Sequence, residues 1–421
     1  MEEKRLWNKD FILVVIGQII SLFGNAILRF ALPLYLLDIT GSATIYGMVL
    51  AFSTIPMIVL SPVGGIIADR VNKRNVMVVL DFGTTALILL FSFFMGRVDQ
   101  VLLILVVMII LYAIQGTYQP TVQASIPALQ VTDNLLPANA VINQVNSISG
   151  LLGPIIGGVL YGFWGLEPIL IVGGISFFLS AVLELFIKIP YQKRPTEKNI
   201  LEMVKSDFSK SFVFIRKDKP VILKSMCIVA VFNLFLTSMI TVGVPVMITQ
   251  ILELSSQLYG LAQGALMAGG VIGGLLVGIL RNRVKIQNAY IILFGTSLTI
   301  LPMAAAFLID APTMLTYVII VICIFLFMMI STVFSVQMLA FIQAETPVHL
   351  IGKVISCVLM LSMCAQPIGN ALYGVLFDTL ADSIWMVMSA VLVISIIISL
   401  ISKSVFTKIK NINKEVILNE L

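Results

Sequence analysis

Three ionisable side chains are expected inside long apolar segments of the chain: Arg29, Asp81 and Glu184. A charge at the centre of a bilayer costs about 2.5–3.5 kcal/mol on insertion scales, so such a residue normally faces a wet cavity or a partner. Arg29 is suited to a ligand that carries an anionic or acceptor group. Asp81 and Glu184 are the acids that could take up and release a coupling proton.

Each of these three residues also has a plainer interpretation. Arg29 could form a structural pair with a buried carbonyl or acid, or snorkel outward toward Asp38. Asp81 could pair with basic residues of a neighbouring loop. Glu184 lies four residues before Lys188, which is the spacing of an ordinary helix pair.

Polar residues at helical spacing accompany Arg29. One stripe consists of Gln18, Ser21, Asn25 and Arg29. Residues three or four apart share one helix face, and comparable stripes occur at 112–123 and 233–241. We predict substrate contacts from Asn25, Arg29, Tyr112, Gln115, Gln119, Asn143, Asn233 and Thr237. Hydrogen bonding between helices is the alternative for each Asn or Gln.

The composition requires lipid around these segments. Of the 421 residues, 59% are hydrophobic and 11% are charged, whereas a soluble domain typically carries about 25% charged residues. So few charges cannot build a water-exposed surface. The net charge of +5 is spread over loops that flank the apolar segments, which argues against a nucleic-acid partner.

Catalysis and metal binding have little support in the sequence. The four cysteines lie in apolar segments without metal-ligand spacing, and His349 is the single histidine. No pair of a nucleophile and a base is apparent. We therefore predict that the protein is not an enzyme and has neither a cofactor nor a metal site.

Twelve segments are long and apolar enough to cross a bilayer, which takes about 20 mostly apolar residues. They begin near Phe11, Thr44, Asn75, Val101, Ala138, Pro168, Ile222, Gln257, Ile286, Thr313, Lys353 and Ser383. The fourth is the hardest to delimit, because polar residues interrupt it between Gly116 and Pro127. If both termini are cytoplasmic, 24 of the 26 Lys and Arg residues fall on the cytoplasmic side, as the positive-inside rule requires. We predict a monomeric, multi-pass protein of the plasma membrane.

One long polar stretch, at 190–221, divides the chain. The predicted organisation is an N-terminal six-helix bundle at 1–189, a cytoplasmic linker at 190–221, a C-terminal six-helix bundle at 222–403 and a cytoplasmic tail at 404–421. Apolar residues at helical spacing in the linker predict an amphipathic helix on the membrane surface, with a flexible linker as the alternative. They are Leu201, Val204, Phe208, Phe212 and Ile215.

The two halves repeat one another at an offset near 212 residues. The run GGVLYG at 157–162 matches GNALYG at 369–374, and Gly64-Gly65 falls near Gly273-Gly274. Two six-span halves have the same orientation, so the repeat axis lies along the membrane normal. Transporters that rock two pseudo-symmetric bundles around a central site have this architecture.

The loop after the second span reads GIIADRVNKR from Gly65 to Arg74. It resembles the cytoplasmic signature of the major facilitator superfamily: a Gly, three residues, then Asp-Arg, with a basic pair after it. Gly65 would permit close helix contact. The resemblance implies that Asp69 lies against the N-terminal end of a neighbouring helix and, with Arg70 and Arg74, gates the cytoplasmic side. The alternative is a positive-inside loop that holds one Asp.

A second motif lies in the fifth span. The run GPIIGG at 153–158 resembles the Gly-Pro motif of the family's antiporters, which implies helix bending at Gly153, Pro154, Gly157 and Gly158. A plain packing role is the alternative. The opening stretch, including the run TGSA at 40–43, looks like the branch that contains macrolide-efflux proteins and the enterobactin exporter.

This resemblance implies a twelve-helix major facilitator fold and a proton-driven exporter of amphiphilic small molecules by alternating access, such as drugs, macrolides or siderophores, in contact with membrane lipids. Many family antiporters carry an Arg near the position of Gln115-Gly116. This chain lacks it, which leaves Asp81 and Glu184 as candidates for proton coupling. Two other functions remain open: a lipid or lysophospholipid flippase of the same fold, and a non-transporting membrane receptor.

Overall fold

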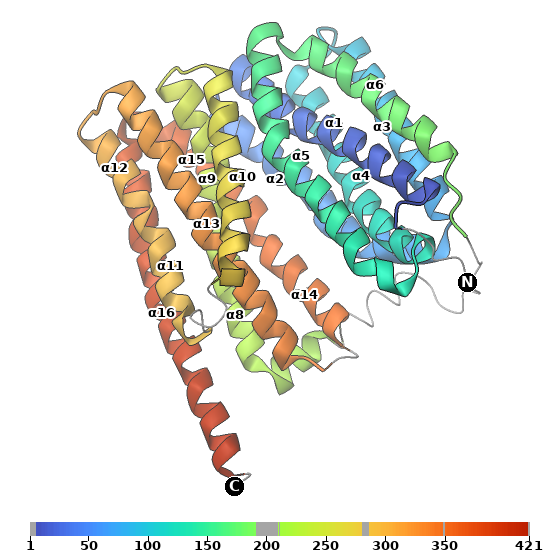
Figure 1. Cartoon of the computed structure of the whole chain (residues 1–421). Coiled ribbons are helices and arrows are strands. Elements are labelled where there is room, and N and C mark those ends of the chain that lie inside the picture. Colours follow the sequence, from blue (N-terminus) through green and yellow to red (C-terminus); the bar gives the residue numbers. More distant parts are fainter. Residues whose placement is uncertain (1–5, 191–208, 210, 280–285, 348–349, 420–421) are drawn as a thin grey trace. The chain divides into compact units, whose positions relative to one another are not determined.

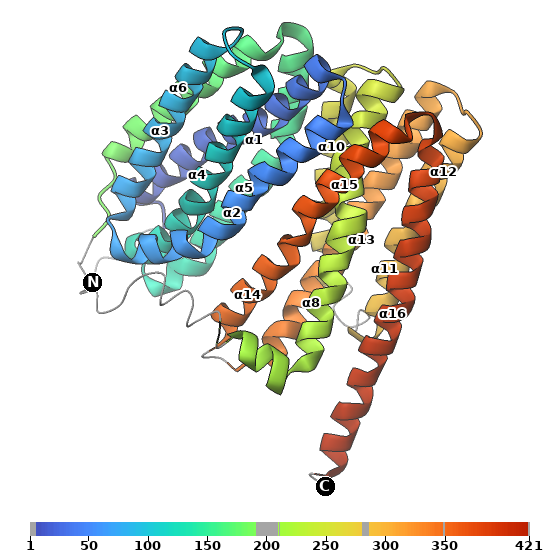
Figure 2. The same cartoon turned by 180° about the vertical axis from the view of Figure 1, so that it is seen from behind.

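The computed structural model describes residues 6–190, 209, 211–279, 286–347 and 350–419, apart from the side chains of Ile66, Asp69 and residues 407–419. The elements in these residues are all helices, and twelve helical segments are long and apolar enough to cross a membrane. Figures 1 and 2 show these helices from opposite sides. The protein is an all-α, multi-pass membrane protein, as its hydropathy predicts.

The first half consists of six long helices. They are α1 (Lys9–Thr40), α2 (Ala43–Arg70), α3 (Lys73–Phe94), α4 (Gln100–Leu129), α5 (Leu135–Trp164), which follows the 3-10 turn η1 (Thr132–Asn134), and α6 (Leu166–Leu185). Local chemistry sets their ends. Asn8 caps α1 by accepting a hydrogen bond from the Phe11 backbone N–H at 2.9 Å. Gly41, at a φ of 58°, ends α1 in the left-handed conformation that glycine tolerates.

The second half has more interruptions. Its seventh span joins α8 (Pro220–Phe232), the π-helix η3 (Asn233–Thr237), α9 (Ser238–Pro245) and the π-helix η4 (Val246–Ile251); a further π-helix, η2 (Phe214–Asp218), precedes it. Then follow α10 (Ser256–Ile279), η5 (Ile286–Asn288), α11 (Ala289–Leu298), α12 (Ile300–Leu308), α13 (Thr313–Glu345), α14 (Ile351–Met363), α15 (Ala365–Thr379), η6 (Ala381–Ser383) and α16 (Ile384–Asn419). Single-turn π segments inside helices are frequent at functional sites.

The predicted spans agree closely with these helices. Eleven of the twelve begin within two residues of the predicted position, and the fifth begins at Thr132, six residues before the predicted Ala138. The fourth span is one unbroken helix that contains both Pro120 and Pro127. The amphipathic helix predicted in the linker falls largely outside the described residues and stays a prediction, and the basic residues at 281–285 also lie outside them.

Contacts between helices divide the described residues into two compact units. Unit 1 comprises 1–41, 52–204 and 255–264, and unit 2 comprises 42–51, 205–254 and 265–421, with the undescribed residues counted in these ranges. The units follow the two halves with one exchange: the first turns of α2 belong to unit 2, and the first turns of α10 belong to unit 1.

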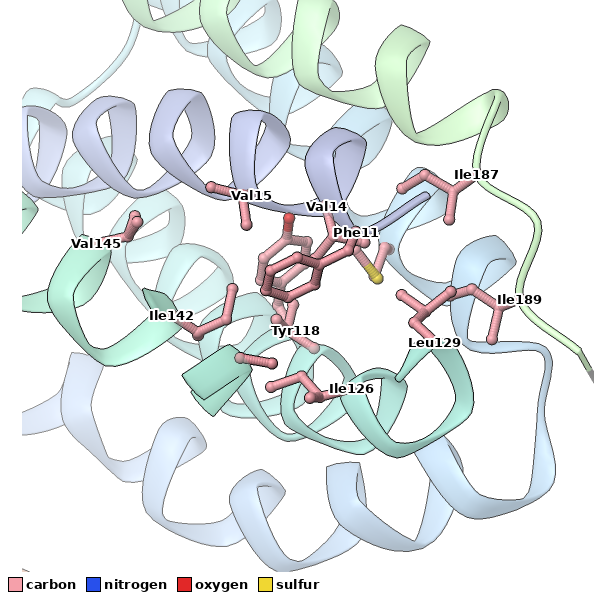
Figure 3. Close-up of a cluster of buried hydrophobic side chains, with 13 residues drawn as sticks. Phe11, Val14, Val15, Tyr118, Ile126, Leu129, Ile142, Val145, Ile187 and Ile189 are labelled. Carbon is pink, nitrogen blue, oxygen red and sulfur yellow. The ribbon is translucent and has the colours of Figure 1, made fainter. Parts of the chain in front are cut away.

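Unit 1 contains a cluster of buried apolar side chains where α1, α4 and α5 meet the chain after α6 (Figure 3). Its labelled members are Phe11, Val14 and Val15 from α1, Tyr118, Ile126 and Leu129 from α4, Ile142 and Val145 from α5, and Ile187 and Ile189 after α6. Lipid tails are as apolar as these side chains, so close packing rather than exclusion from water holds the cluster together. Tyr118, which is 5% exposed, packs its ring among these side chains.

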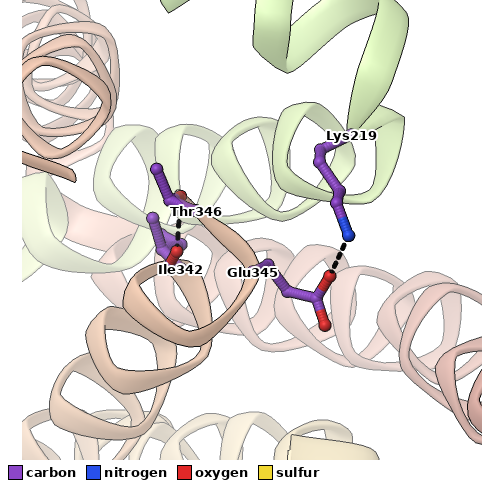
Figure 4. Close-up of polar contacts among 4 residues, drawn as sticks. All are labelled: Lys219, Ile342, Glu345 and Thr346. Carbon is purple, nitrogen blue, oxygen red and sulfur yellow. Dashed lines mark hydrogen bonds and ion pairs between the residues drawn. The ribbon is translucent and has the colours of Figure 1, made fainter. Parts of the chain in front are cut away.

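Unit 2 contains an ion pair between the chain before α8 and the end of α13 (Figure 4). Lys219 Nζ lies 2.6 Å from Glu345 Oε2, and the two side chains are 41% and 28% exposed. It is the one ion pair found among the described residues. Thr346, directly after α13, donates to the Ile342 carbonyl at 2.6 Å. A pair so exposed contributes little to stability, about 0–1 kcal/mol.

Close glycine contacts recur at equivalent places in the two halves. In unit 1, a Cβ added to Gly64 of α2 would lie 2.7 Å from the Gly116 carbonyl oxygen of α4. In unit 2, a Cβ added to Gly273 of α10 would collide with the Met329 carbonyl oxygen of α13. Gly64 lies near Gly273 in the alignment of the two halves, and both halves use glycine to bring two backbones together.

These contacts correct the packing role expected of Gly65. A Cβ added to Gly65 would meet no described heavy atom within 4 Å. The close approach therefore falls on Gly64, one residue earlier, because a one-residue step turns the helix by about 100° and moves Gly65 off the face that meets α4.

We expect Gly64→Ala to destabilise the protein and Gly65→Ala not to destabilise it, since alanine favours a helix where space is open. The alanine methyl at 64 must push apart two backbones, and overpacking of this kind typically costs about 1–3 kcal/mol. The measurement is the thermal stability of each purified variant in detergent. Equal stabilities would contradict the contact between α2 and α4.

Candidate functional site

The acids predicted to carry protons are both buried in unit 1. Asp81 of α3 is 2% exposed, and Glu184 of α6 is 0% exposed. The Ser21 hydroxyl of α1 donates to Asp81 Oδ2 at 2.6 Å. The same hydroxyl lies 2.8 Å from Ser180 Oγ of α6, and Ser180 donates to the Gly17 carbonyl at 3.1 Å.

Glu184 is held by a tyrosine from a third helix. The Tyr118 hydroxyl of α4 donates to Glu184 Oε1 at 2.7 Å, while Oε2 is buried without a partner in the described part of the chain. Ser180 and Glu184 are four residues apart and face Gly17 of α1 together. A Cβ at Gly17 would lie 3.4 Å from Ser180 Oγ and 3.6 Å from Glu184 Cγ, so glycine leaves room for both.

We call Ser21, Asp81, Tyr118, Ser180 and Glu184 the acid network. It has one neighbour with unsatisfied polar atoms. Gln18, next to Gly17 on α1, is 0% exposed, and neither its amide nitrogen nor its amide oxygen has a hydrogen-bond partner among the described residues. Buried polar atoms nearly always have hydrogen-bond partners, so the Gln18 amide is an exception that lies beside the acid network.

A small cavity borders the acid network. It measures about 20 Å³, which is room for about one water molecule. The polar side chains that line it are Ser21, Asn25, Asp81, Gln115, Tyr118 and Gln119. Three residues predicted to bind substrate and one predicted to bind a proton therefore share one cavity in unit 1.

Arg29 lies one further turn along α1. Its Nη1 donates to Gln115 Oε1, and its guanidinium carbon lies 3.9 Å from the centre of the Tyr112 ring, a cation–π contact. The bond to the Gln115 side-chain carbonyl fits the alternative of a structural pair. The alternative of snorkelling toward Asp38 is wrong, because the guanidinium contacts Gln115 and Tyr112, while Asp38 accepts a hydrogen bond from Tyr161 at 2.7 Å. A guanidinium has five N–H donors, so these contacts leave it able to bind a ligand acceptor.

The alternative of an ion pair between Glu184 and Lys188 is also wrong. Helix α6 ends at Leu185, so Lys188 is not on a continuing helical turn. The backbone N–H of Lys188 donates to Asp10 at 2.9 Å, and its side chain is exposed.

The other predicted contact residues lie elsewhere. Asn233 and Thr237 belong to unit 2, where the Asn233 amide donates to the Ser362 carbonyl at 3.1 Å and accepts from the Thr237 hydroxyl at 3.1 Å. This arrangement matches the alternative of hydrogen bonding between helices. Asn143 of α5 is exposed. Their contact with substrate stays a prediction.

The two sequence motifs are described in part. The Asp69 side chain lies outside the described atoms, so its place against a helix end stays a prediction. Gly153, Pro154, Gly157 and Gly158 all lie in α5, which is continuous through Pro154. Gly158 packs on Gly260 of α10, where an added Cβ would lie 2.8 Å from the Gly260 Cα.

Sequence reasoning missed the hydroxyl partners of the acids. Tyr118 and Ser180 were not among the predicted site residues, although a signal existed for each. Ser180 lies four residues before Glu184, and Tyr118 lies three residues after Gln115, so each shares a helix face with a predicted residue.

The chain is similar in sequence to known proteins. The family model described as Major Facilitator Superfamily matches residues 14–370. Macrolide efflux protein A of Streptococcus pyogenes is 24% identical over 410 residues, which cover 94% of this chain and 96% of that protein. The Macrolide efflux protein A of Enterococcus faecalis is 22% identical over 341 residues, covering 78% of this chain and 99% of that protein.

Solved structures are similar in fold. The nucleoside transporter NupG has a TM-score of 0.74 at 13% identity, with 94% of this chain and 99% of that chain covered. The POT family transporter PepTSo has a TM-score of 0.73 at 12% identity, with 96% and 99% covered. The TM-scores show a common fold, and at identities this low the similarity is one of fold alone.

Proposed function

The chain belongs to the Major Facilitator Superfamily, and from that premise we propose that it is a proton-coupled exporter of amphiphilic small molecules. The observation that carries the proposal is the acid network of unit 1, whose Asp81 and Ser21 line the same cavity as Asn25 and Gln115. Buried acids inside spans are rare, and in transporters they commonly form proton relays.

Helix α1 connects the two parts of this site. Ser21 bonds Asp81, Asn25 lines the cavity, and Arg29 bonds Gln115. Ser21 and Arg29 are eight residues apart, about 12 Å along the helix. A proton bound to Asp81 acts on α1 through Ser21, and a ligand bound to Arg29 acts on the same helix directly.

Gln115 gives the coupling a local mechanism. Its side-chain oxygen accepts from Arg29, and its side chain also lines the cavity beside Asp81. A substrate acceptor that replaces Gln115 at the guanidinium frees the Gln115 amide to turn toward Asp81, where its N–H groups favour the ionised carboxylate. Binding of substrate thus promotes release of the proton, which is the linkage that an antiporter requires.

The substrate class follows from the same residues and from the relatives. Arg29 offers donors to an acceptor-rich ligand, and Tyr112 offers an aromatic face. Two of the similar proteins are named for macrolide efflux. A macrolide combines an apolar ring with many oxygen acceptors, so its chemistry matches the donors of Arg29 and the aromatic face of Tyr112.

Efflux from proteoliposomes tests the proposal. With erythromycin inside the vesicles, we expect acidic external buffer to accelerate efflux, because protons entering down their gradient drive substrate out. A protonophore should return efflux to the rate without a gradient. Equal rates with and without the gradient would remove the antiport claim.

A lipid or lysophospholipid flippase is the second candidate, and one feature of unit 2 favours it. Phe235, Leu372, Tyr373, Leu376, Val387 and Val391 help to line an apolar cavity of about 350 Å³. A cavity of this size without a charged lining residue is suited to an acyl chain. Transfer of a fluorescent lipid between leaflets, without erythromycin efflux, would favour this function.

A further inference from the structure

Helices α2 and α15 meet in unit 2 at a charged contact. The carboxylate of Asp378, near the end of α15, accepts hydrogen bonds from the backbone N–H groups of Ala43 and Thr44 at 2.7 and 2.8 Å. It also accepts one from the Ser42 hydroxyl at 2.7 Å. We call these four residues the clasp.

The clasp uses the free donors at the start of α2. The first N–H groups of a helix have no partner within it, and the helix dipole makes this end attractive to a carboxylate. Ser42 serves twice, since its oxygen also accepts from the Ile45 N–H at 3.2 Å while its hydroxyl donates to Asp378. One carboxylate of α15 thereby completes the cap of another helix.

Glycines bring the two backbones together next to the clasp. A Cβ added to Gly374 of α15 would lie 2.7 Å from the Ala43 carbonyl oxygen and 3.2 Å from the Gly47 Cα. Tyr46 and Leu50 of α2 are 4% and 6% exposed there. The first turns of α2 are thus packed closely against α15.

The sequence repeat places an equivalent contact in unit 1, between α10 and α5. There Gly260 approaches Gly158, with 2.8 Å between an added Cβ at Gly158 and the Gly260 Cα. The repeat offset of 212 residues carries Asp378 onto Leu166, which has no carboxylate. Both contacts have the glycines, and among the residues that the structure describes a carboxylate clasp is found where α2 meets α15.

We propose that the clasp is an external latch whose opening is a step of the transport cycle. The inference rests on the proposed function, because it assumes alternating access with both termini in the cytoplasm. In that orientation α2 begins and α15 ends on the external face. The latch holds the start of α2 on α15 while that face is closed, and its bonds break when the face opens to release substrate.

A role as a latch gives the carboxylate of Asp378 a purpose that glycine packing does not serve. Glycine packing alone gives a contact that depends on shape, whereas three bonds to one carboxylate all break when the two helices separate. The change is therefore close to two-state, as a gate requires. Because all three bonds converge on Asp378, removing this one carboxylate should shift the balance between the closed and open external face.

Thiol labelling from outside the cell tests the latch. The background has Cys227, Cys323, Cys357 and Cys364 replaced by serine or alanine, and carries Leu50→Cys as the reporter. A membrane-impermeant maleimide reads how often the external face exposes position 50. We expect Asp378→Asn to raise the labelling rate about tenfold, since an amide cannot accept all three bonds with the strength of a carboxylate.

Asp382→Asn is the matched control, because Asp382 is an acid four residues further along and takes no part in the clasp. It should label at the parent rate. Ser42→Ala removes one of the three bonds and should give a smaller rise than Asp378→Asn. This second variant decides the matter if Asp378→Asn is not recovered folded. Parent-like labelling of a folded clasp variant overturns the latch.

The labelling experiment and the efflux experiment can fail independently, so the latch and the proposed function are tested separately. If efflux depends on the pH gradient and labelling is unchanged, the latch fails and the antiporter stands. If labelling rises and efflux ignores the gradient, the latch stands and proton coupling fails.

Discussion

Replacing Glu184 by Gln should remove gradient-driven efflux and leave a folded protein. The amide keeps the shape of the side chain and still accepts the Tyr118 hydrogen bond, which spans 2.7 Å in the native protein. It cannot bind and release a proton. We expect the acceleration of efflux by a pH gradient to fall at least about tenfold, the scale of losing an interaction essential to the driven step. Asp81→Asn should behave in the same way, because Asp81 shares the acid network.

Glu167→Gln is the control for this prediction. Glu167 lies in the first turn of the same helix and is exposed. Its neutralisation changes the net charge equally without touching the acid network. Native coupling in Glu184→Gln, measured alongside Glu167→Gln, would show that the proton binds elsewhere.

Arg29→Gln should raise the erythromycin concentration needed for half-maximal efflux by about ten- to a hundredfold. Charge-assisted hydrogen bonds contribute about 1.5–3 kcal/mol each, and the variant loses both the charge and the stack on Tyr112. Arg29→Lys should recover part of the loss, since it restores the charge without the planar fork. The initial efflux rate against substrate concentration gives the values.

Arg97→Gln is the matched control for Arg29. Arg97 also stacks on an aromatic ring, with its guanidinium carbon 4.2 Å from the centre of Phe93, and it is exposed between α3 and α4. Arg97→Gln should keep the apparent affinity of the native protein for erythromycin. If Arg29→Gln also keeps it, a substrate role for Arg29 is rejected.

The spans and the family could be predicted because their signals are local and strong. Hydropathy marks any helix that faces lipid, whichever helices it packs against. The contrast of 59% hydrophobic with 11% charged residues excludes a soluble fold without any contact being known. The predicted start of the fifth span was six residues late, because the short polar turn η1 precedes α5 and belongs to the span.

The candidate site could be predicted only along each helix. Helical spacing placed Asn25 and Arg29 on one face of α1, and Gln115 on one face of α4. It does not show how each helix is rotated about its axis relative to its neighbours, and so it does not show which side chains meet. Tyr118 and Ser180 share a helix face with a predicted residue, but spacing alone did not reveal that their hydroxyls meet the acids of other helices or Ser21. Asp378 was missed because its partners are mainly backbone N–H groups, which every residue but proline has.

Irregular helix geometry limited the prediction for the seventh span. Asn233 and Thr237 were placed on a face by assuming 3.6 residues per turn. They are the first and last residues of the π-helix η3, which is closed by the backbone N–H of Ser238 donating to the carbonyl of Asn233, five residues earlier. The Ser238 hydroxyl donates to the same carbonyl at 3.0 Å. The wider turn directs Asn233 to Ser362, a contact that sequence spacing does not reveal.

Proton release on substrate binding tests the central claim most directly. Erythromycin is added to the purified protein in weakly buffered detergent solution that contains a pH indicator. The native protein should release protons on binding, and the double variant Asp81→Asn, Glu184→Gln should bind erythromycin without any release. Equal proton release by the native protein and the double variant would contradict the account.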